Sequence, residues 1–208
     1  MVWDGYTGGE IASRLATVSA KEYIEKYIST IKLEHDEILD LIKNAMDYAN
    51  ETVKNKGEEI EELEQMGTTL EICLIYKGKM YIGHIGDSRI YRIRKNIIRR
   101  LTTDHSYVET LVKDGKITRE EAFYHPKKNM LIKALGCTSK IEPDITVKEF
   151  LDDDVILMCS DGLTNMIKEN EIYDIIDENP DEACDKLVTK ANELGGYDNI
   201  SVIIISNR

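Results

Sequence analysis

Hydrophobic residues recur at helical spacing in the first quarter of the chain. Within residues 10–27, Ile11, Leu15, Val18 and Ile24 recur at helical spacing. A second helical pattern extends from about residue 33 to residue 54. The two segments predict consecutive amphipathic helices.

Short runs rich in β-branched and aromatic residues follow from residue 69 onward. Turn sequences such as Lys77-Gly78-Lys79 separate the runs, as expected of strands joined by tight connections. The first four runs cover residues 70–76, 80–85, 88–93 and 97–101. Their succession predicts an antiparallel meander, in which each strand pairs with the next.

The rest of the chain mixes helical and strand patterns. Residues 104–129 have a helical pattern with a break at Asp114-Gly115, which predicts an inserted helical surface element. Further strands are predicted at 145–150, 155–159 and 200–206, and further helices at 168–177 and 181–194. Helices before, between and after antiparallel strands are typical of an α+β layered fold.

Length and composition favour a single globular domain spanning residues 1–208. The chain is 42% hydrophobic and 32% charged, which is ordinary for a folded protein. Its formal net charge of -12 opposes binding to nucleic acid or to an anionic membrane, because both are densely negative. An acidic protein that handles phosphate therefore needs metal ions or local cations.

The sequence also bears on the cellular compartment. Apolar runs are far shorter than the ~20 residues that span a membrane, and the first ten residues lack the pattern of a secretory signal. The four cysteines lie far apart without zinc-site spacing, which favours reduced thiols. We therefore expect a cytoplasmic protein without a membrane association.

Four aspartates stand at the ends of predicted strands beside small or polar residues. A carboxylate at a strand end projects into a cleft, and a neighbouring glycine allows close approach of a ligand, as oxygen-rich Mg²⁺ and Mn²⁺ sites require. Taken singly, an Asp-Gly pair is more typical of a plain turn. The segments are Asp4-Gly5, Gly86-Asp87-Ser88-Arg89, Ser160-Asp161-Gly162 and Gly196-Tyr197-Asp198-Asn199.

Together with two threonine-containing motifs, these segments form an ordered series that resembles the PPM (PP2C-type) serine/threonine phosphatases, particularly the bacterial ones. The resemblance covers essentially the whole chain. It is carried by Val2-Trp3-Asp4-Gly5, Gly67-Thr68-Thr69, Gly86-Asp87-Ser88-Arg89, Leu101-Thr102-Thr103-Asp104-His105, Ser160-Asp161-Gly162-Leu163 and Asp198-Asn199-Ile200-Ser201.

The resemblance implies both a fold and an activity. The fold would be a β-sandwich of antiparallel sheets flanked by helices, in a four-layer αββα arrangement. The activity would be hydrolysis of phosphoserine and phosphothreonine in phosphorylated proteins, by a water activated between two Mn²⁺ or Mg²⁺ ions. Residues 104–129 occupy the place of the family's flap, a variable element beside the cleft.

The resemblance also assigns roles to individual residues. Asp4 would bridge the two metals, the Gly5 carbonyl would bind one of them, and Asp161 and Asp198 would complete the ligand set. Asp87 with Asp161 matches a third, weaker metal site. Arg89 and the Gly67-Thr68-Thr69 motif have structural interpretations of equal or greater weight, and so do the four histidines.

The sequence departs from the family pattern at its beginning. Only three residues precede Asp4, so we expect a domain without the usual two strands that carry a phosphate-binding arginine and an acidic pair. Tyr6 stands where some relatives have a histidine, and a phenol of pKa about 10 is a poorer general acid. Uncovered sheet edges would then favour self-association.

Two alternatives to an active phosphatase follow from these departures. The first is a phosphatase-like domain that keeps its fold and metals but acts as a weak regulator or phosphoprotein-binding module. The second is an acidic structural domain in which the aspartates only form turns.

Overall fold

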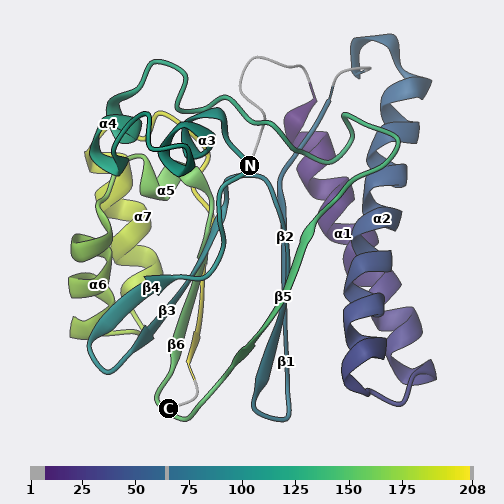
Figure 1. Cartoon of the computed structure of the whole chain (residues 1–208), viewed down its shortest axis with the longest axis horizontal. Helices are drawn as coiled ribbons and strands as arrows, with labels where there is room; N and C mark the ends of the chain where they lie inside the picture. Colours follow the sequence, from purple (N-terminus) through teal and green to yellow (C-terminus); the bar gives the residue numbers. More distant parts are fainter. Residues whose placement is uncertain (1–7, 64–65, 207–208) are drawn as a thin grey trace. The chain divides into compact units, whose positions relative to one another are not determined.

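The computed structural model describes residues 8–63 and 66–206, which divide into two compact units (Figure 1). The N-terminal unit combines residues 8–86 with residues 132–150, and the C-terminal unit combines residues 87–131 with residues 151–206. Each unit has its own antiparallel sheet, helices and hydrophobic cluster. Antiparallel sheets flanked by helices confirm the predicted α+β class. Within the described ranges, no helix is long and apolar enough to cross a membrane.

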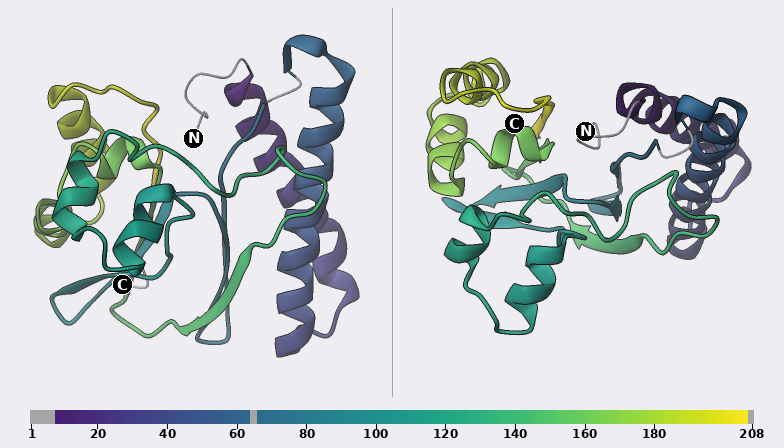
Figure 2. Two further views of the ribbon diagram at one scale, coloured as in Figure 1. Left: turned by 45° about the horizontal axis from the view of Figure 1, so that its top comes forward. Right: turned by 90° about the horizontal axis from the view of Figure 1, so that it is seen from above.

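Two long helices form one layer of the N-terminal unit. They are α1 (Gly9–Tyr27) and α2 (His35–Glu59), followed by the short turns η1 (Ile28–Thr30) and η2 (Glu61–Leu63), respectively. The helices lie side by side in both views of the unit (Figures 1 and 2). Small buried side chains on α1, among them Ala12 and Ala16, allow this close packing.

The start of α2 is stabilised by a reciprocal cap. The side chain of Glu34 accepts a hydrogen bond from the backbone three residues on, and the backbone N–H of Glu34 donates to Glu37 Oε2 at 3.3 Å. These bonds satisfy donors that a helix end leaves without partners. The helix extends five residues beyond the predicted end at residue 54.

The sheet of the N-terminal unit has three strands in the order β1-β2-β5. They are β1 (Leu70–Tyr76), β2 (Lys79–Ile85) and β5 (Asp144–Glu149). The turn between β1 and β2 places Lys77 and Gly78 at positive φ, 47° and 71°, which suits the twist of a two-residue hairpin. The two long helices cover one face of this sheet (Figure 2).

Gly83 on β2 marks where helix α2 presses most closely on the sheet. A Cβ at this position would lie 2.6 Å from Ile42 Cγ2 and 2.7 Å from Met46 Sδ, well inside normal contact. We expect Gly83→Ala to lower the free energy of unfolding by about 1–3 kcal/mol through overpacking, as measured by urea denaturation. Lys79→Ala, at an exposed position of the same strand, should change it by less than about 0.5 kcal/mol.

The sheet of the C-terminal unit has four antiparallel strands in the order β4-β3-β6-β7. The strands are β3 (Arg89–Arg94), β4 (Ile97–Arg100), β6 (Val155–Cys159) and β7 (Val202–Ser206). Two helices, α6 (Glu169–Glu178) and α7 (Ala183–Glu193), pack on this sheet around a core that includes Tyr91, Leu157 and Leu187.

The flap, residues 104–129, belongs to the C-terminal unit and contains two short helices. They are α3 (Tyr107–Lys113) and α4 (Arg119–Tyr124), with the predicted break at Asp114-Gly115 between them. Ser106 and Thr118 cap the two helices through their side-chain oxygens. The four-residue helix α5 (Asp161–Thr164) directly follows β6 and was not predicted from the sequence.

The predicted meander is wrong in its strand pairing. Strand β2 pairs with β1 and β5, whereas β3 pairs with β4 and β6, so the two hairpins belong to different sheets. The chain passes from one sheet to the other at Gly86, whose φ of 116° is disfavoured for other residues. A Cβ at Gly86 would also collide with the side chain of Thr69.

Candidate functional site

Asp161 lies at the end of strand β6, where the chain turns directly into helix α5. The preceding residue, Ser160, ties this turn to the beginning of β7. Its Oγ donates to the Asn199 carbonyl at 2.9 Å and accepts from the backbone N–H of Ser201 at 2.9 Å. These bonds hold the segment around residue 199 beside the β6–α5 turn.

Gly162 brings the same two segments into close contact. A Cβ on Gly162 would collide with the backbone carbonyl of Asn199, so only glycine fits without a shift of the backbone. Asp198 precedes Asn199 in the connection from α7 to β7, and it is half-buried. The glycine of the Asp-Gly pair therefore allows Asp161 and Asp198 to approach each other.

Gly162→Ala should accordingly weaken a ligand held jointly by Asp161 and Asp198. We expect Mn²⁺ affinity to fall by about 10–100-fold, because the added methyl group displaces the Asp198 segment. Isothermal titration calorimetry measures the effect. Lys113→Ala, at an exposed flap position that does not line the pocket, is the control, and an equal loss in both variants would contradict the prediction.

The Asp161 carboxylate is buried and only partly satisfied. Its side chain is 4% exposed, and Oδ2 accepts a hydrogen bond from Asn165 Nδ2 at 2.9 Å. Among the described residues, Oδ1 has no hydrogen-bond partner. Burial and the negative charge of Asp198 raise the pKa of Asp161 to about 7. A carboxylate kept in this state is destabilised until a cation or a proton neutralises it.

Asp87 belongs to the same site. It follows Gly86 at the point where the chain enters the C-terminal unit, and its side chain is 5% exposed. Asp87 and Asp161 line one pocket of about 370 Å³. The pocket extends from these two aspartates to the flap, with Arg89, Arg100, Asp104, Glu109, Arg119, Lys128, Asn165, Lys168 and Glu169 among its polar lining residues.

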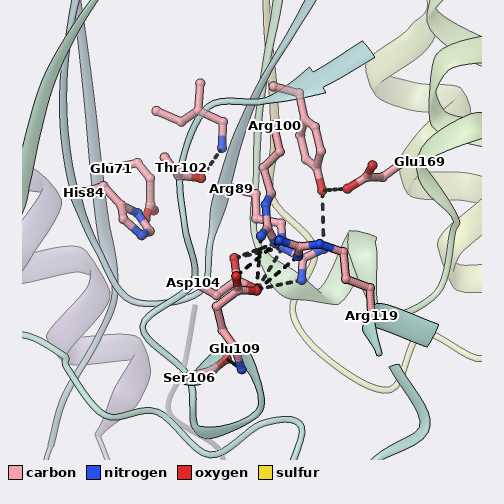
Figure 3. A network of polar contacts seen from close by, with 12 residues as sticks. Glu71, His84, Arg89, Arg100, Thr102, Asp104, Ser106, Glu109, Arg119 and Glu169 are labelled. Carbon is pink, nitrogen blue, oxygen red and sulfur yellow. Dashed lines mark hydrogen bonds and ion pairs between the residues drawn. The ribbon is translucent and has the colours of Figure 1, made fainter. Parts of the chain in front are cut away.

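A chain of ion pairs connects the sheet to the flap along this pocket (Figure 3). Arg89 donates to both carboxylate oxygens of Asp104, the shortest bond being Nη2 to Oδ2 at 2.7 Å. Arg100 bridges Asp104 and Glu109, at 3.2 Å from each. Arg119 on α4 donates to both carboxylate oxygens of Glu109, at 3.2 and 3.3 Å. Two-point Arg–carboxylate pairing of this kind fixes orientation as well as distance.

The network also reaches helix α6. The hydroxyl of Tyr91 accepts from Arg89 Nη1 at 3.3 Å and donates to Glu169 Oε1 at 3.2 Å. Burial raises the pKa of Tyr91, so the phenol remains protonated. The sequence contained Arg89 and Asp104 within separate motifs, but no spacing rule links residues 15 positions apart, and their pairing was not predicted.

Not every predicted site residue can be located. Asp4, Gly5 and Tyr6 lie outside the described residues. Asp87, Asp161 and Asp198 all fall in the C-terminal unit, where Asp161 shares the pocket with Asp87 and interacts electrostatically with Asp198. Residues 8–63 and 66–206 by themselves contain no group of three or more His, Cys, Asp or Glu side chains able to hold a metal ion.

Three of the four histidines have described neighbours within their own unit. His84 is buried on β2, with Nδ1 at 3.0 Å from Glu71 Oε1 in the N-terminal unit. His125 Nδ1 accepts from the backbone N–H of Lys127 at 3.1 Å in the flap. The ring of His35 lies 5.7 Å from that of Tyr81.

The observed carboxylates fit a divalent cation. Hard cations such as Mg²⁺ and Mn²⁺ prefer carboxylate oxygens. Asp161 offers a buried oxygen without a hydrogen bond, and its neighbour Asp198 carries the same charge. A cation placed between them would remove the repulsion that raises the pKa of Asp161.

Comparison with known families gives a match over most of the chain. Residues 3–183 match the family described as protein phosphatase 2C. "Serine/threonine phosphatase stp" of Listeria welshimeri is 37% identical over 203 residues, which cover 97% of this chain and 80% of that protein. "Protein phosphatase PhpP" of Streptococcus pneumoniae is 37% identical over 205 residues, covering 97% and 81%.

Solved structures show the same fold. The serine/threonine phosphatase Stp1 of Staphylococcus aureus has a TM-score of 0.89 at 31% identity, covering 99% of this chain and 80% of that one. The phosphatase PstP/Ppp of Mycobacterium tuberculosis has a TM-score of 0.84 at 32% identity, covering 96% and 83%. A further structure of the catalytic domain of PstP is in complex with two manganese ions, with a TM-score of 0.83 at 30% identity, covering 96% and 82%.

Proposed function

The chain belongs to the protein phosphatase 2C family, and from this premise we propose that Asp4, Asp87, Asp161 and Asp198, with the Gly5 carbonyl, hold its catalytic metal ions. The protein is a metal-dependent serine/threonine phosphatase, and its substrates are phosphorylated proteins. Two ions, Mn²⁺ or Mg²⁺, are supported by the two manganese ions in the PstP complex. Asp87 with Asp161 would form a third, weaker site.

One observation carries the assignment of these residues. Asp161 has a buried carboxylate oxygen without a hydrogen-bond partner in the described structure, and Asp198 adds a second negative charge beside it. Burial of like charges is unfavourable unless a cation compensates them. The arrangement therefore supports a site built for a cation, rather than turn-forming aspartates.

The residues around Asp161 would prepare the site for its ions. Asn165 donates to Oδ2, while Oδ1 has no hydrogen-bond partner among the described residues and would be available to an ion. Ser160 and Gly162 keep the Asp198 segment within reach. Bound at this site, the metal ions would supply an acidified water and positive charge for the phosphoryl oxygens, so that no protein nucleophile is needed.

The alternative of a catalytically weak, phosphoprotein-binding domain has no specific observation in its favour. The chain is similar over nearly its whole length to proteins named as phosphatases.

A cytoplasmic location is part of the proposal. It is supported by the four cysteines, which are all free thiols, as is typical of a reducing compartment.

The test is hydrolysis of a phosphothreonine peptide by the purified chain with and without Mn²⁺. We expect turnover only with the metal, and calorimetric binding of about two ions per chain. Folded protein that binds Mn²⁺ without turnover would favour the binding-module alternative. Absence of Mn²⁺ binding in folded protein would remove the metal assignment.

A further inference from the structure

The pocket that contains Asp87 and Asp161 is larger than a metal site requires. Its volume of about 370 Å³ lies within the range of small-ligand pockets, roughly 300–1,000 Å³. The end away from the aspartates is walled by the flap helices α3 and α4 and by the segment before α6. The part of the pocket that metal ions would not fill therefore lies against the flap.

The three arginines that line this pocket are paired with carboxylates of the protein, whereas Lys128 and Lys168 also line it. Arg89 is paired with Asp104, and Arg100 with both Asp104 and Glu109. Arg119 is paired with Glu109 (Figure 3). An anionic group of a ligand would have to displace one of these pairs and leave a buried carboxylate without its partner, which is costly. The arginines therefore organise the wall and are poorly suited to bind a second anion.

The flap wall also presents a group of apolar side chains, next to the polar Glu120, Tyr124 and Lys128. Val108 and Val112 come from α3, Ala122 and Phe123 from α4, and Ile167 from the segment before α6. The ammonium of Lys128 lies 5.3 Å from the centroid of the Phe123 ring. These apolar side chains favour an apolar ligand group, because removing apolar surface from water is what stabilises such a contact.

Resting on the proposed phosphatase function, we propose that this wall is a substrate subsite for a large apolar side chain close to the phosphorylated residue. The pocket is continuous with Asp87 and Asp161, where the phosphate would lie. A peptide that places its phosphate there brings a neighbouring side chain against the flap. The preferred phosphoprotein segments would then carry leucine, isoleucine or phenylalanine next to the phosphothreonine.

The test is a series of phosphothreonine peptides in an alanine background, with leucine, aspartate or lysine placed at each neighbouring position in turn. Leucine at one position should lower KM by about 10-fold relative to alanine, because burying its side chain contributes at least that much. Aspartate and lysine should give no such gain. Equal KM values for all peptides, or a preference for aspartate, would overturn the proposal.

Ala122→Phe fills the pocket from helix α4 and should abolish the leucine preference. Hydrolysis of p-nitrophenyl phosphate, which has no neighbouring side chain, should change by less than about twofold because the metal ligands are untouched. Lys113→Phe adds the same ring at an exposed flap position that does not line the pocket, and should keep the preference. Retention of the preference in Ala122→Phe would overturn the proposal.

Two further measurements keep the subsite separable from catalysis and from misfolding. Fluorescence anisotropy of labelled peptides with Mn²⁺ present reports binding preference without turnover, so loss of catalysis alone would affect only the proposed function. Phe123→Ala removes part of the wall instead of filling it, and should lower the leucine preference while circular dichroism shows an intact fold. An unchanged preference in folded Phe123→Ala would count against the subsite.

Discussion

Asp161→Asn is expected to abolish phosphatase activity and yet to stabilise the metal-free protein. Activity should fall on the order of 10³-fold or more, since the variant lacks a charge of the proposed metal ligand set. In the presence of a chelator at pH 8, the melting temperature should rise by about 5 °C, because the variant no longer buries a charge beside Asp198. Thermal unfolding followed by circular dichroism measures the change.

The pH dependence of this effect has a definite sign. The pKa of Asp161 is about 7 in the folded protein, compared with an ordinary value of 3.8, so the folded state retains a proton that the unfolded chain has lost. The stability of the metal-free wild type should therefore fall as pH rises between about 4 and 7. The stability of Asp161→Asn should lack this pH dependence. The melting temperatures of the two proteins should therefore become equal as the pH falls toward 4.

Mn²⁺ should reverse the order of stability. A ligand that binds only the folded state raises the melting temperature, and this rise should occur in the wild type but not in Asp161→Asn. Asp153→Asn provides the control, because Asp153 is an exposed loop residue whose positive φ of 67° asparagine also tolerates. Equal melting temperatures for wild type and Asp161→Asn in chelator at pH 8 would show that the buried Asp161 charge beside Asp198 does not destabilise the metal-free protein.

Arg94→Met is expected to cause the largest loss of stability in the C-terminal unit. Asp154 is completely buried, and both of its oxygens accept from Arg94, at 2.6 and 2.7 Å. Asp154 also accepts from the Leu151 backbone, which holds the connection entering β6. Removing the guanidinium leaves a buried charge, which typically costs about 3–5 kcal/mol, measurable by urea denaturation.

This loss should also depend on pH. Burial opposes ionisation of Asp154, but the hydrogen bonds from Arg94 and Leu151 hold its pKa below the ordinary value of 3.8. The stability that the ionised Asp154 contributes is therefore fully present above pH 3.8, and it is lost as the pH falls through the pKa of the folded state. The difference between wild type and Arg94→Met should shrink toward low pH.

Arg99→Met makes the same chemical change at an exposed position on the neighbouring strand β4. It should alter the free energy of unfolding by less than about 0.5 kcal/mol. A loss in Arg94→Met no larger than in this control would show that the buried pair does not stabilise the fold.

Most helices and strands were predictable because each forms a single local pattern. Strands β1 and β6 have the bounds expected from their β-branched runs, and α1 begins one residue earlier than expected. Helix α2 continues to Glu59 through polar residues, where apolar spacing gives no signal. The four residues of α5 are too short to show a period at all.

The candidate site was predictable as a set of residue types and positions. Asp87 and Asp161 were identified from their strand-end motifs, and the structure places both in one pocket. The contact of Gly162 with Asn199 and the pairing of Arg89 with Asp104 were not predictable. Both depend on how segments far apart in the chain are packed, which no local pattern encodes.

The sequence by itself determined the α+β class, the family and the aspartates proposed as metal ligands, because periodicity and ordered motifs are local properties. Only the tertiary structure decided that β2 pairs with β5 and that β3 pairs with β6, since backbone hydrogen bonds between strands do not depend on which side chains face each other. It also decided the raised pKa of Asp161, because burial and the proximity of Asp198 exist only after folding.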